Sequence, residues 1–260
     1  MVNDNLYAHF HPDERPFVDK ASDWVQRAAD HTVKVTDFLD PRQAFILESL
    51  VNREPDVNIR FDGGYEGAER KRAVIVPDYR DPEDEDIHLQ VLEISSDDTR
   101  FSELEHGDFL GALLGLGIKR DKIGDLHVHS SKCHCLVAGE MIGFVDTELR
   151  HVHRVHVLTD IVPLSRLEVA KVSLEEMSLS VASLRLDGIV SDVCRLSRAK
   201  VLAPIQNGRC KVNWKVVEDP SKPLQEGDVV SFQGFGRFKV LEVEGVTKKG
   251  RIRVKIGKYI

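Results

Sequence analysis

The chain has 260 residues, and with 42% hydrophobic and 30% charged residues its composition excludes wholesale disorder and suits one large domain or two to three small ones. No apolar run approaches the roughly 20 residues that span a bilayer, and the first residues lack the basic and apolar regions of a signal peptide. We therefore expect a cytoplasmic protein without a membrane partner, whose four cysteines stay reduced.

The net charge of −7 is divided unevenly along the chain. Residues 1–180 hold 20 Lys and Arg against 35 Asp and Glu, whereas residues 181–260 hold 16 against 8. This asymmetry indicates that the basic C-terminal part binds a polyanion while the acidic part has another role. A solvated basic face is the alternative that charge alone leaves open.

Residues 1–55 are predicted to form a helical segment. The first helix begins near Pro12 and carries one apolar stripe, with spacings of four, three and four residues, formed by Phe17, Ala21, Trp24 and Ala28. Asp40 and Pro41 are typical of an N-cap followed by the first residue of a second helix. Both apolar stripes are interpreted as core.

Residues 56–165 mix the two periodicities. Alternating apolar residues predict strands at 57–61, 72–77, 87–94, 125–129, 133–138 and 153–158. Helices are predicted at 103–116, where Gly117 is a C-cap, and at 140–149. Helices interleaved with strands indicate an α+β domain of ferredoxin-like or RRM-like type. A polar connector is expected at residues 166–180.

The basic part begins with a short apolar-periodic helix at Leu186 to Val193. Ser197 is typical of an N-cap for a second helix, which Gly208 ends. A helix N-terminus offers free N–H groups and a positive dipole end, and Arg198 and Lys200 lie in this first turn. The sequence therefore predicts a phosphate seat here. Alternating residues then predict a hairpin at 209–217 and a strand at 227–232.

These residues resemble the alpha-L RNA-binding domain first named from ribosomal protein S4. The shared pattern is Arg-Leu-Asp, then Ser-Arg-x-Lys, then Gly-Arg-x-x-Val-Asn, then Gly-Asp-Val. The resemblance implies an alpha-L domain with a C-terminal strand extension over residues 181–260. It also implies RNA contacts, for which the alternative is solvated surface charge, by Arg185, Arg195, Ser197, Arg198, Lys200, Arg209, Lys211 and Lys215.

Two positions depart from the alpha-L pattern. The usual hairpin turn is Asn-Gly, which adopts positive φ easily, but here it is Asn213-Trp214. Trp214 is either a platform for base stacking or a packed aromatic residue, and packing is favoured. Pro204 lies inside the second helix, which it should kink or shorten.

Four further blocks resemble the YlmH family of bacteria. They are Thr-Asp-Phe-Leu-Asp-Pro at 36–41, Phe-Asp-Gly-Gly-Tyr-Glu-Gly-Ala-Glu-Arg-Lys-Arg at 61–72, Leu-Leu-Gly-Leu-Gly-Ile-Lys-Arg-Asp-Lys-Ile-Gly-Asp at 113–125 and Thr-Lys-Lys-Gly-Arg-Ile-Arg at 247–253. The resemblance implies an RRM-like domain followed by the alpha-L domain. It implies binding to rRNA or tRNA on large ribosomal subunits that carry peptidyl-tRNA, in ribosome-associated quality control, and a link to cell division.

A metal site or a catalytic site is the alternative to RNA binding. His127, His129, Cys133 and Cys135 offer zinc ligands, but Cys-x-Cys is not the usual knuckle spacing, so no metal is expected. No phosphate-binding loop, nucleophile elbow or dinucleotide fingerprint is present, so we expect no cofactor and no small-molecule substrate. The rival interpretations are an RNA-modifying enzyme, of pseudouridine synthase or methyltransferase type, and an interaction scaffold.

Overall fold

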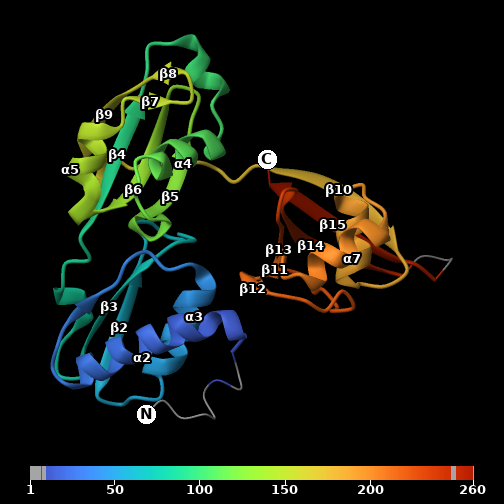
Figure 1. The fold of residues 1–260 in the computed structure, drawn as a ribbon, viewed down its shortest axis with the longest axis horizontal. Helices are drawn as coiled ribbons and strands as arrows, with labels where there is room; N and C mark the ends of the chain where they lie inside the picture. The colour runs from blue at the N-terminus through green and yellow to red at the C-terminus, as the bar shows by residue number, and fades with distance from the viewer. Residues whose placement is uncertain (1–6, 8–9, 247–249, 260) are drawn as a thin grey trace. The chain divides into compact units, whose positions relative to one another are not determined.

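In a computed structural model, the described part of the chain comprises residue 7, residues 10–246 and residues 250–259. Part of the expected N-terminal segment and residues 247–249 of the fourth YlmH-like block lie outside these residues. The chain divides into two compact units, residues 1–170 and residues 171–260 (Figure 1). No helix of the described residues combines the length and apolar content of a membrane span.

The N-terminal layer of the first unit packs two helices on a three-stranded antiparallel sheet of order β1-β3-β2 (Figure 1). The second helix starts as predicted, because Asp40 and Gln43 form a reciprocal capping box and Pro41 occupies the first turn. The elements are α2 (Arg15–Ala29), β1 (Lys34–Val35), α3 (Pro41–Val51), β2 (Val57–Asp62) and β3 (Arg72–Pro77).

The strands β2 and β3 belong to this layer, although the sequence placed them at the start of the ferredoxin-like domain. Lys34 pairs with Ile75, and Ala73 and Ile75 enter the same core as the two helices. All six residues of β3 are buried, because Val74 and Val76 fill a second cluster on the opposite face. A central strand buried on both faces shows no alternation that assigns it to one layer.

The second layer has the ferredoxin-like order that was predicted. Its chain order is β-α-β-β-α-β and its sheet order is β5-β6-β4-β9. The helices α4 and α5 pack on one face, where Phe109, Leu113, Ile142 and Val145 join the core. These elements are β4 (Leu89–Ser95), α4 (His106–Gly115), β5 (Ile123–Val128), β6 (Lys132–Ala138), α5 (Gly139–Glu148) and β9 (Leu158–Val162).

Short elements complete the first unit. They are the 3-10 turns η1 (Pro12–Glu14), η2 (Pro82–Asp84), η3 (Thr99–Glu103), η4 (Arg120–Lys122) and η5 (Leu164–Arg166), and the two-residue strands β7 (His151–Val152) and β8 (Val155–His156). The strand predicted at 153–158 is thus divided between β8 and the start of β9.

The second unit is a six-stranded antiparallel sheet of order β10-β15-β14-β13-β11-β12, with α6 and α7 on one face (Figure 1). The predicted connector at 166–180 instead contains most of β10, which pairs with β15 from Leu174↔Tyr259 to Val181↔Ile252. The elements are β10 (Leu174–Val181), α6 (Leu186–Val193), α7 (Arg198–Gln206), β11 (Cys210–Val212), β12 (Lys215–Val216), β13 (Val229–Phe232), β14 (Gly236–Val246) and β15 (Ile252–Tyr259).

Both departures from the alpha-L pattern are accommodated. Asn213 and Trp214 have φ values of 50° and 63°, so the pair makes the two-residue turn with two positive φ angles that Asn-Gly usually supplies. The Asn213 side chain supports this turn, since its Oδ1 accepts the N–H of Val229 at 2.9 Å and its Nδ2 donates to Asp228 at 2.8 Å. The helix α7 ends at Gln206, two residues after Pro204.

Candidate RNA-binding surface

The first turn of α7 is open at its N-terminus. Ser197 occupies the N-cap with extended backbone, but its side chain makes no capping hydrogen bond. The predicted side-chain cap is therefore wrong: the Ser197 side chain accepts no N–H group of the helix, although the Ser197 carbonyl accepts that of Lys200 at 2.9 Å. Arg198 and Lys200 are exposed beside these N–H groups. Because the first N–H groups of a helix lack an acceptor one turn earlier in the helix, those of Arg198 and Ala199 can donate to a phosphate oxygen.

Arg185 and Arg198 both lie at the start of α6, near the carboxylate of Asp187. Arg185 donates from Nε and Nη2 to the two carboxylate oxygens of Asp187, at 3.1 and 3.2 Å. The guanidinium of Arg198 lies over Gly188, where an added Cβ would stand 2.7 Å from Nη2. Arg185 is therefore bonded to Asp187, and Arg198 contributes a second positive charge nearby.

The environment of Asp187 keeps it ionised. Burial raises its pKa, but the hydrogen bonds from Arg185 and from the N–H of Gly188, together with the charges of Arg185 and Arg198, lower the pKa below the ordinary value. The side chain of Asp187 is only 6% exposed. A catalytic aspartate must reach its substrate, whereas this one is enclosed and bonded to Arg185 and to the N–H of Gly188.

The cations of the hairpin follow the predicted alternation. Arg209 and Lys211 are exposed on either side of the buried Cys210, and Lys215 is half-buried at the start of β12. Arg209 also holds the hairpin in the sheet, because its carbonyl accepts the N–H of Gln233 at 3.0 Å. These three side chains follow the sheet, so they do not extend the cluster formed by Arg185 and Arg198.

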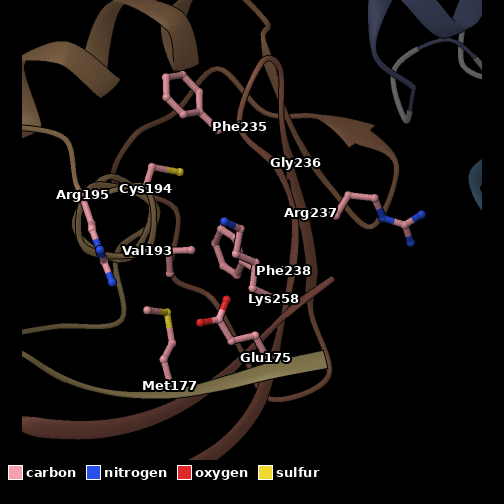
Figure 2. A pocket seen from close by; sticks show the side chains of 10 residues that line it. All are labelled: Glu175, Met177, Val193, Cys194, Arg195, Phe235, Gly236, Arg237, Phe238 and Lys258. Atoms are coloured by element: carbon pink, nitrogen blue, oxygen red, sulfur yellow. The ribbon is translucent and has the colours of Figure 1, made fainter. Parts of the chain in front are cut away.

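Arg195 lies apart from the other candidates. It follows α6 with a φ of 53° and lines a pocket of about 320 Å³ between the end of α6 and strands β10, β14 and β15. Figure 2 shows Glu175 and Lys258, which are cross-strand neighbours, on the side of the pocket opposite Arg195. The carboxylate of Glu175 offsets part of the positive charge of Arg195 and Lys258, so this pocket attracts phosphate less strongly.

The histidines and cysteines considered as zinc ligands point to opposite faces of the β5–β6 pair. His127 pairs with His134, whereas Cys133 and Cys135 enter the core under α4 and α5. Burial raises the pKa of Cys135 to about 12, which disfavours the thiolate that zinc requires. Among the described residues, no group of three His, Cys, Asp or Glu side chains is placed to hold a metal ion.

The face of the four-stranded sheet that an RRM uses for RNA is covered in this chain. Phe38 and Leu167 pack on it with Tyr65, over Val91 and Leu136. The fit is close, because a Cβ at Gly124 would stand 2.7 Å from the Phe38 ring. Bases stack on exposed aromatic residues of an open sheet, so this domain does not offer the usual RRM surface.

Asp125 joins this face to the second YlmH-like block. Its Oδ2 accepts the Tyr65 hydroxyl at 2.8 Å and the N–H of Glu69 at 2.7 Å, and its Oδ1 accepts the N–H of Arg70 at 3.2 Å. Arg70 and Arg72 in turn donate to main-chain oxygens of Phe38 and Thr36. Arg70 also donates to the carbonyl of Ile123 at 3.2 Å and Arg72 to that of His88 at 2.7 Å, so the arginines of this block hold the two layers together, a role that the sequence pattern did not indicate.

Comparison with known proteins places these units in families. The model described as "YlmH, N-terminal" matches residues 13–80, "Putative RNA-binding domain in YlmH" matches residues 82–166 and "S4 domain" matches residues 184–230. The first two models meet between β3 and β4, where the structure passes from one sheet to the next, rather than at residue 56. Fold and cluster together define an α+β protein with a C-terminal S4 domain of the alpha-L type.

The whole chain identifies the family more narrowly. Ribosome-associated protein quality control protein P2 of Bacillus subtilis (strain 168) is 41% identical over 251 residues, which are 96% of this chain and 97% of the relative. The chain belongs to the YlmH family. The structure of cell division protein ylmH from Streptococcus pneumoniae has the same fold with a TM-score of 0.54 and 24% identity, over 62% of this chain and 98% of that chain.

Proposed function

We propose that this chain binds structured RNA on the ribosome, rRNA or tRNA of large subunits that carry peptidyl-tRNA, as a non-catalytic cytoplasmic factor of ribosome-associated quality control. The observation that carries the proposal is the cluster at the start of α6 and α7. There, Arg185 is bonded to the carboxylate of Asp187 and the guanidinium of Arg198 lies over Gly188, beside a helix N-terminus without a side-chain cap. The name of the Bacillus subtilis relative and the RNA-binding type of the matched domains support it.

The cluster suits a phosphate of folded RNA better than a base edge. A guanidinium held by a buried carboxylate, as that of Arg185 is by Asp187, loses little freedom on binding, and guanidinium groups present donors in the planar arrangement that matches phosphate oxygens. The N–H groups of the α7 first turn add donors and a positive dipole end. Contacts of this kind set position and affinity on an RNA backbone without selecting its sequence.

The proposal is tested by Arg198→Ala. We expect weaker binding to large subunits on sucrose gradients, and a plot of log affinity against log salt whose slope falls by about 0.7–0.9, the share of one phosphate contact. The control is Arg27→Ala, which removes an exposed arginine that pairs with Asp23 on α2 and should change neither quantity. Unchanged affinity and slope in the Arg198 variant would place the RNA surface elsewhere.

The enzyme interpretation is less well supported by the geometry. Arg185-Leu186-Asp187 echoes a pseudouridine synthase tripeptide, but the carboxylate of Asp187 is enclosed and bonded to Arg185 and to the N–H of Gly188. Incubation of the purified protein with bulk RNA, followed by analysis of its nucleosides, should show no modified product. A new nucleoside formed in proportion to the protein would favour the enzyme.

A further inference from the structure

The sheet of the second unit has two unlike faces. One face is buried under α6 and α7, where Val230, Phe238, Val240 and Ile256 form the core. Residues that alternate with these point to the other side, where they are half-buried or exposed along β13 and β15, except that Gly257 is buried beside Leu174 and Leu241. Figure 2 shows this division at two successive residues of β14: the side chain of Phe238 lines the pocket, whereas that of Arg237 is directed away from it.

Cations and aromatic rings gather at one end of the open face. Lys211 pairs with Ser231, and Ser231 with Arg237, so the two cations belong to one row across three strands. The guanidinium of Arg237 lies 5.2 Å from the ring centroid of Trp214 and 4.7 Å from that of Tyr259. We call the group at this end the basic sheet face, and its members are Lys211, Trp214, Arg237, Lys239 and Tyr259.

Positive charge is concentrated at this end of the open face. Towards the other end, Lys255 pairs with Glu176 at 2.7 Å and stands opposite Glu242, so its charge is offset. Asp228 lies near the Asn213 turn, where it accepts from the side chain of Asn213 and from the N–H of Gln225, both at 2.8 Å. These neutral donors do not cancel its charge, which stands against the three cations Lys211, Arg237 and Lys239. A polyanion is therefore favoured over an acidic or neutral protein surface.

The chemistry of the basic sheet face suits nucleotides that are not base-paired. Aromatic rings accept a base in stacking only when the base is free of a duplex, and lysines beside them hold the phosphates. The guanidinium between Trp214 and Tyr259 orients both rings before any ligand binds. The cluster at the start of α6 and α7, in contrast, offers the guanidiniums of Arg185 and Arg198 and main-chain N–H groups for phosphate.

We infer that the basic sheet face binds an unpaired nucleotide of the RNA, with its base stacked on Trp214 or Tyr259 and its phosphates at Lys211 and Lys239. This inference rests on the proposed function and adds a second contact, on the side of the sheet away from α6 and α7. The domain then distinguishes RNA that has a single-stranded segment next to a folded one from RNA that is folded throughout.

The test uses the full chain with Trp24→Phe, which leaves Trp214 as its one tryptophan, since the sequence has two. Two probes are compared: a blunt RNA hairpin, and the same hairpin with a single-stranded adenosine tail. We expect the tail to raise affinity about five-fold or more, the lower end of what stacking one base on an aromatic ring contributes. It should also quench the Trp214 emission, whereas the blunt hairpin should bind without quenching.

Trp214→Gly, made in the chain that keeps Trp24, separates loss of the ring from loss of the fold. The change creates the Asn-Gly pair that this turn type favours, so the hairpin keeps its geometry while the ring is removed. The variant should lose the gain in affinity from the tail and keep its affinity for the blunt hairpin. The matched control is Phe235→Leu, which alters an aromatic residue that is 45% exposed but lies at the pocket on the other face, and it should keep the gain.

The outcomes separate this inference from the proposed function. If the blunt hairpin binds and Arg198→Ala weakens it, but the tail adds no affinity and no quenching, the inference is wrong and the proposed function stands. If, in addition, the emission of Trp214 changes when protein extracted from large subunits is added but not when either RNA is added, the basic sheet face belongs to a protein partner. If neither probe binds, the proposed function is wrong, and the inference that rests on it is wrong as well.

Discussion

At the scale of single residues, the same chemistry has different roles according to burial. Arg70 and Arg72 donate across the two layers of the first unit, to the carbonyls of Ile123 and His88, whereas Arg198 is exposed. Burial lowers the pKa of Arg70 in spite of four nearby carboxylates. Arginine is suited to both situations, because its planar group stays charged and satisfies several acceptors at once.

Leu186 tests the difference between a structural and a binding residue. It is fully buried in the core of the second unit, one position from Arg185 and Asp187. Leu186→Ala should lower the free energy of unfolding by about 2–5 kcal/mol, because it removes buried methyl groups and leaves a cavity. Urea unfolding of the full chain measures this, and Arg198→Ala should unfold at the wild-type urea concentration. Equal losses of stability in both variants would contradict the assignment of Arg198 to the surface.

At the scale of elements, the ferredoxin-like sheet is closed on the face where an RRM is open. Segment 164–170 contributes to this closure through main-chain bonds to buried histidines. The N–H of Glu168 donates to Nδ1 of His134 at 2.9 Å, and the N–H of Ala170 donates to Nδ1 of His127 at 3.3 Å. Both imidazoles accept through a nitrogen that loses this capacity on protonation.

His127 should make the stability of the first unit depend on pH. Burial lowers the pKa of His127 below its ordinary 6.5, with smaller contributions from His129 and His134 and an opposing one from Asp125. The folded state therefore binds fewer protons than the unfolded state, so this stabilisation is complete above pH 6.5 and is lost as pH falls through the folded pKa. Each pH unit between the two pKa values should remove up to about 1.4 kcal/mol.

The measurement is urea unfolding at pH 7.5, 6 and 5 for the wild type and for His127→Asn. The asparagine keeps an acceptor for the N–H of Ala170 but does not titrate, so its stability should fall less steeply with acid. Glu93, whose pKa is lowered mainly by its hydrogen bond with His134, loses its contribution in both proteins and cancels in the comparison. Parallel pH profiles would show that His127 does not carry the effect.

At the scale of the whole molecule, the charge asymmetry coincides with two units that each have a core. We expect a fragment of residues 171–260 to fold and to keep most of the RNA affinity, because it contains the cations and all six strands of its sheet. A fragment that begins at residue 182 lacks β10 and exposes the edge of β15, so it should unfold or aggregate. Circular dichroism and the blunt-hairpin assay test both. RNA binding by residues 1–170 alone, with none by 171–260, would refute this division.

Local features of the sequence determined the helix starts, the strand alternation and the family. Asp40-Pro41 caps α3, and the spacing of Leu186, Ile189, Val190 and Val193 marks the buried side of α6, because both depend on neighbours within a few residues. The same is true of the exposed positions Arg209 and Lys211, which follow from alternation within one strand.

The tertiary structure alone decided which faces are covered and which partners meet. Register placed His127 opposite His134 and turned Cys133 and Cys135 into the core, which alternation within each strand left open. Pairing across more than 70 residues made β10 a strand and not a connector, and Phe38 closed a sheet formed by residues far along the chain. Trp214, Arg237 and Tyr259 meet only because three strands bring them together. Such contacts depend on the burial and pairing of segments distant in sequence, so local periodicity cannot predict them.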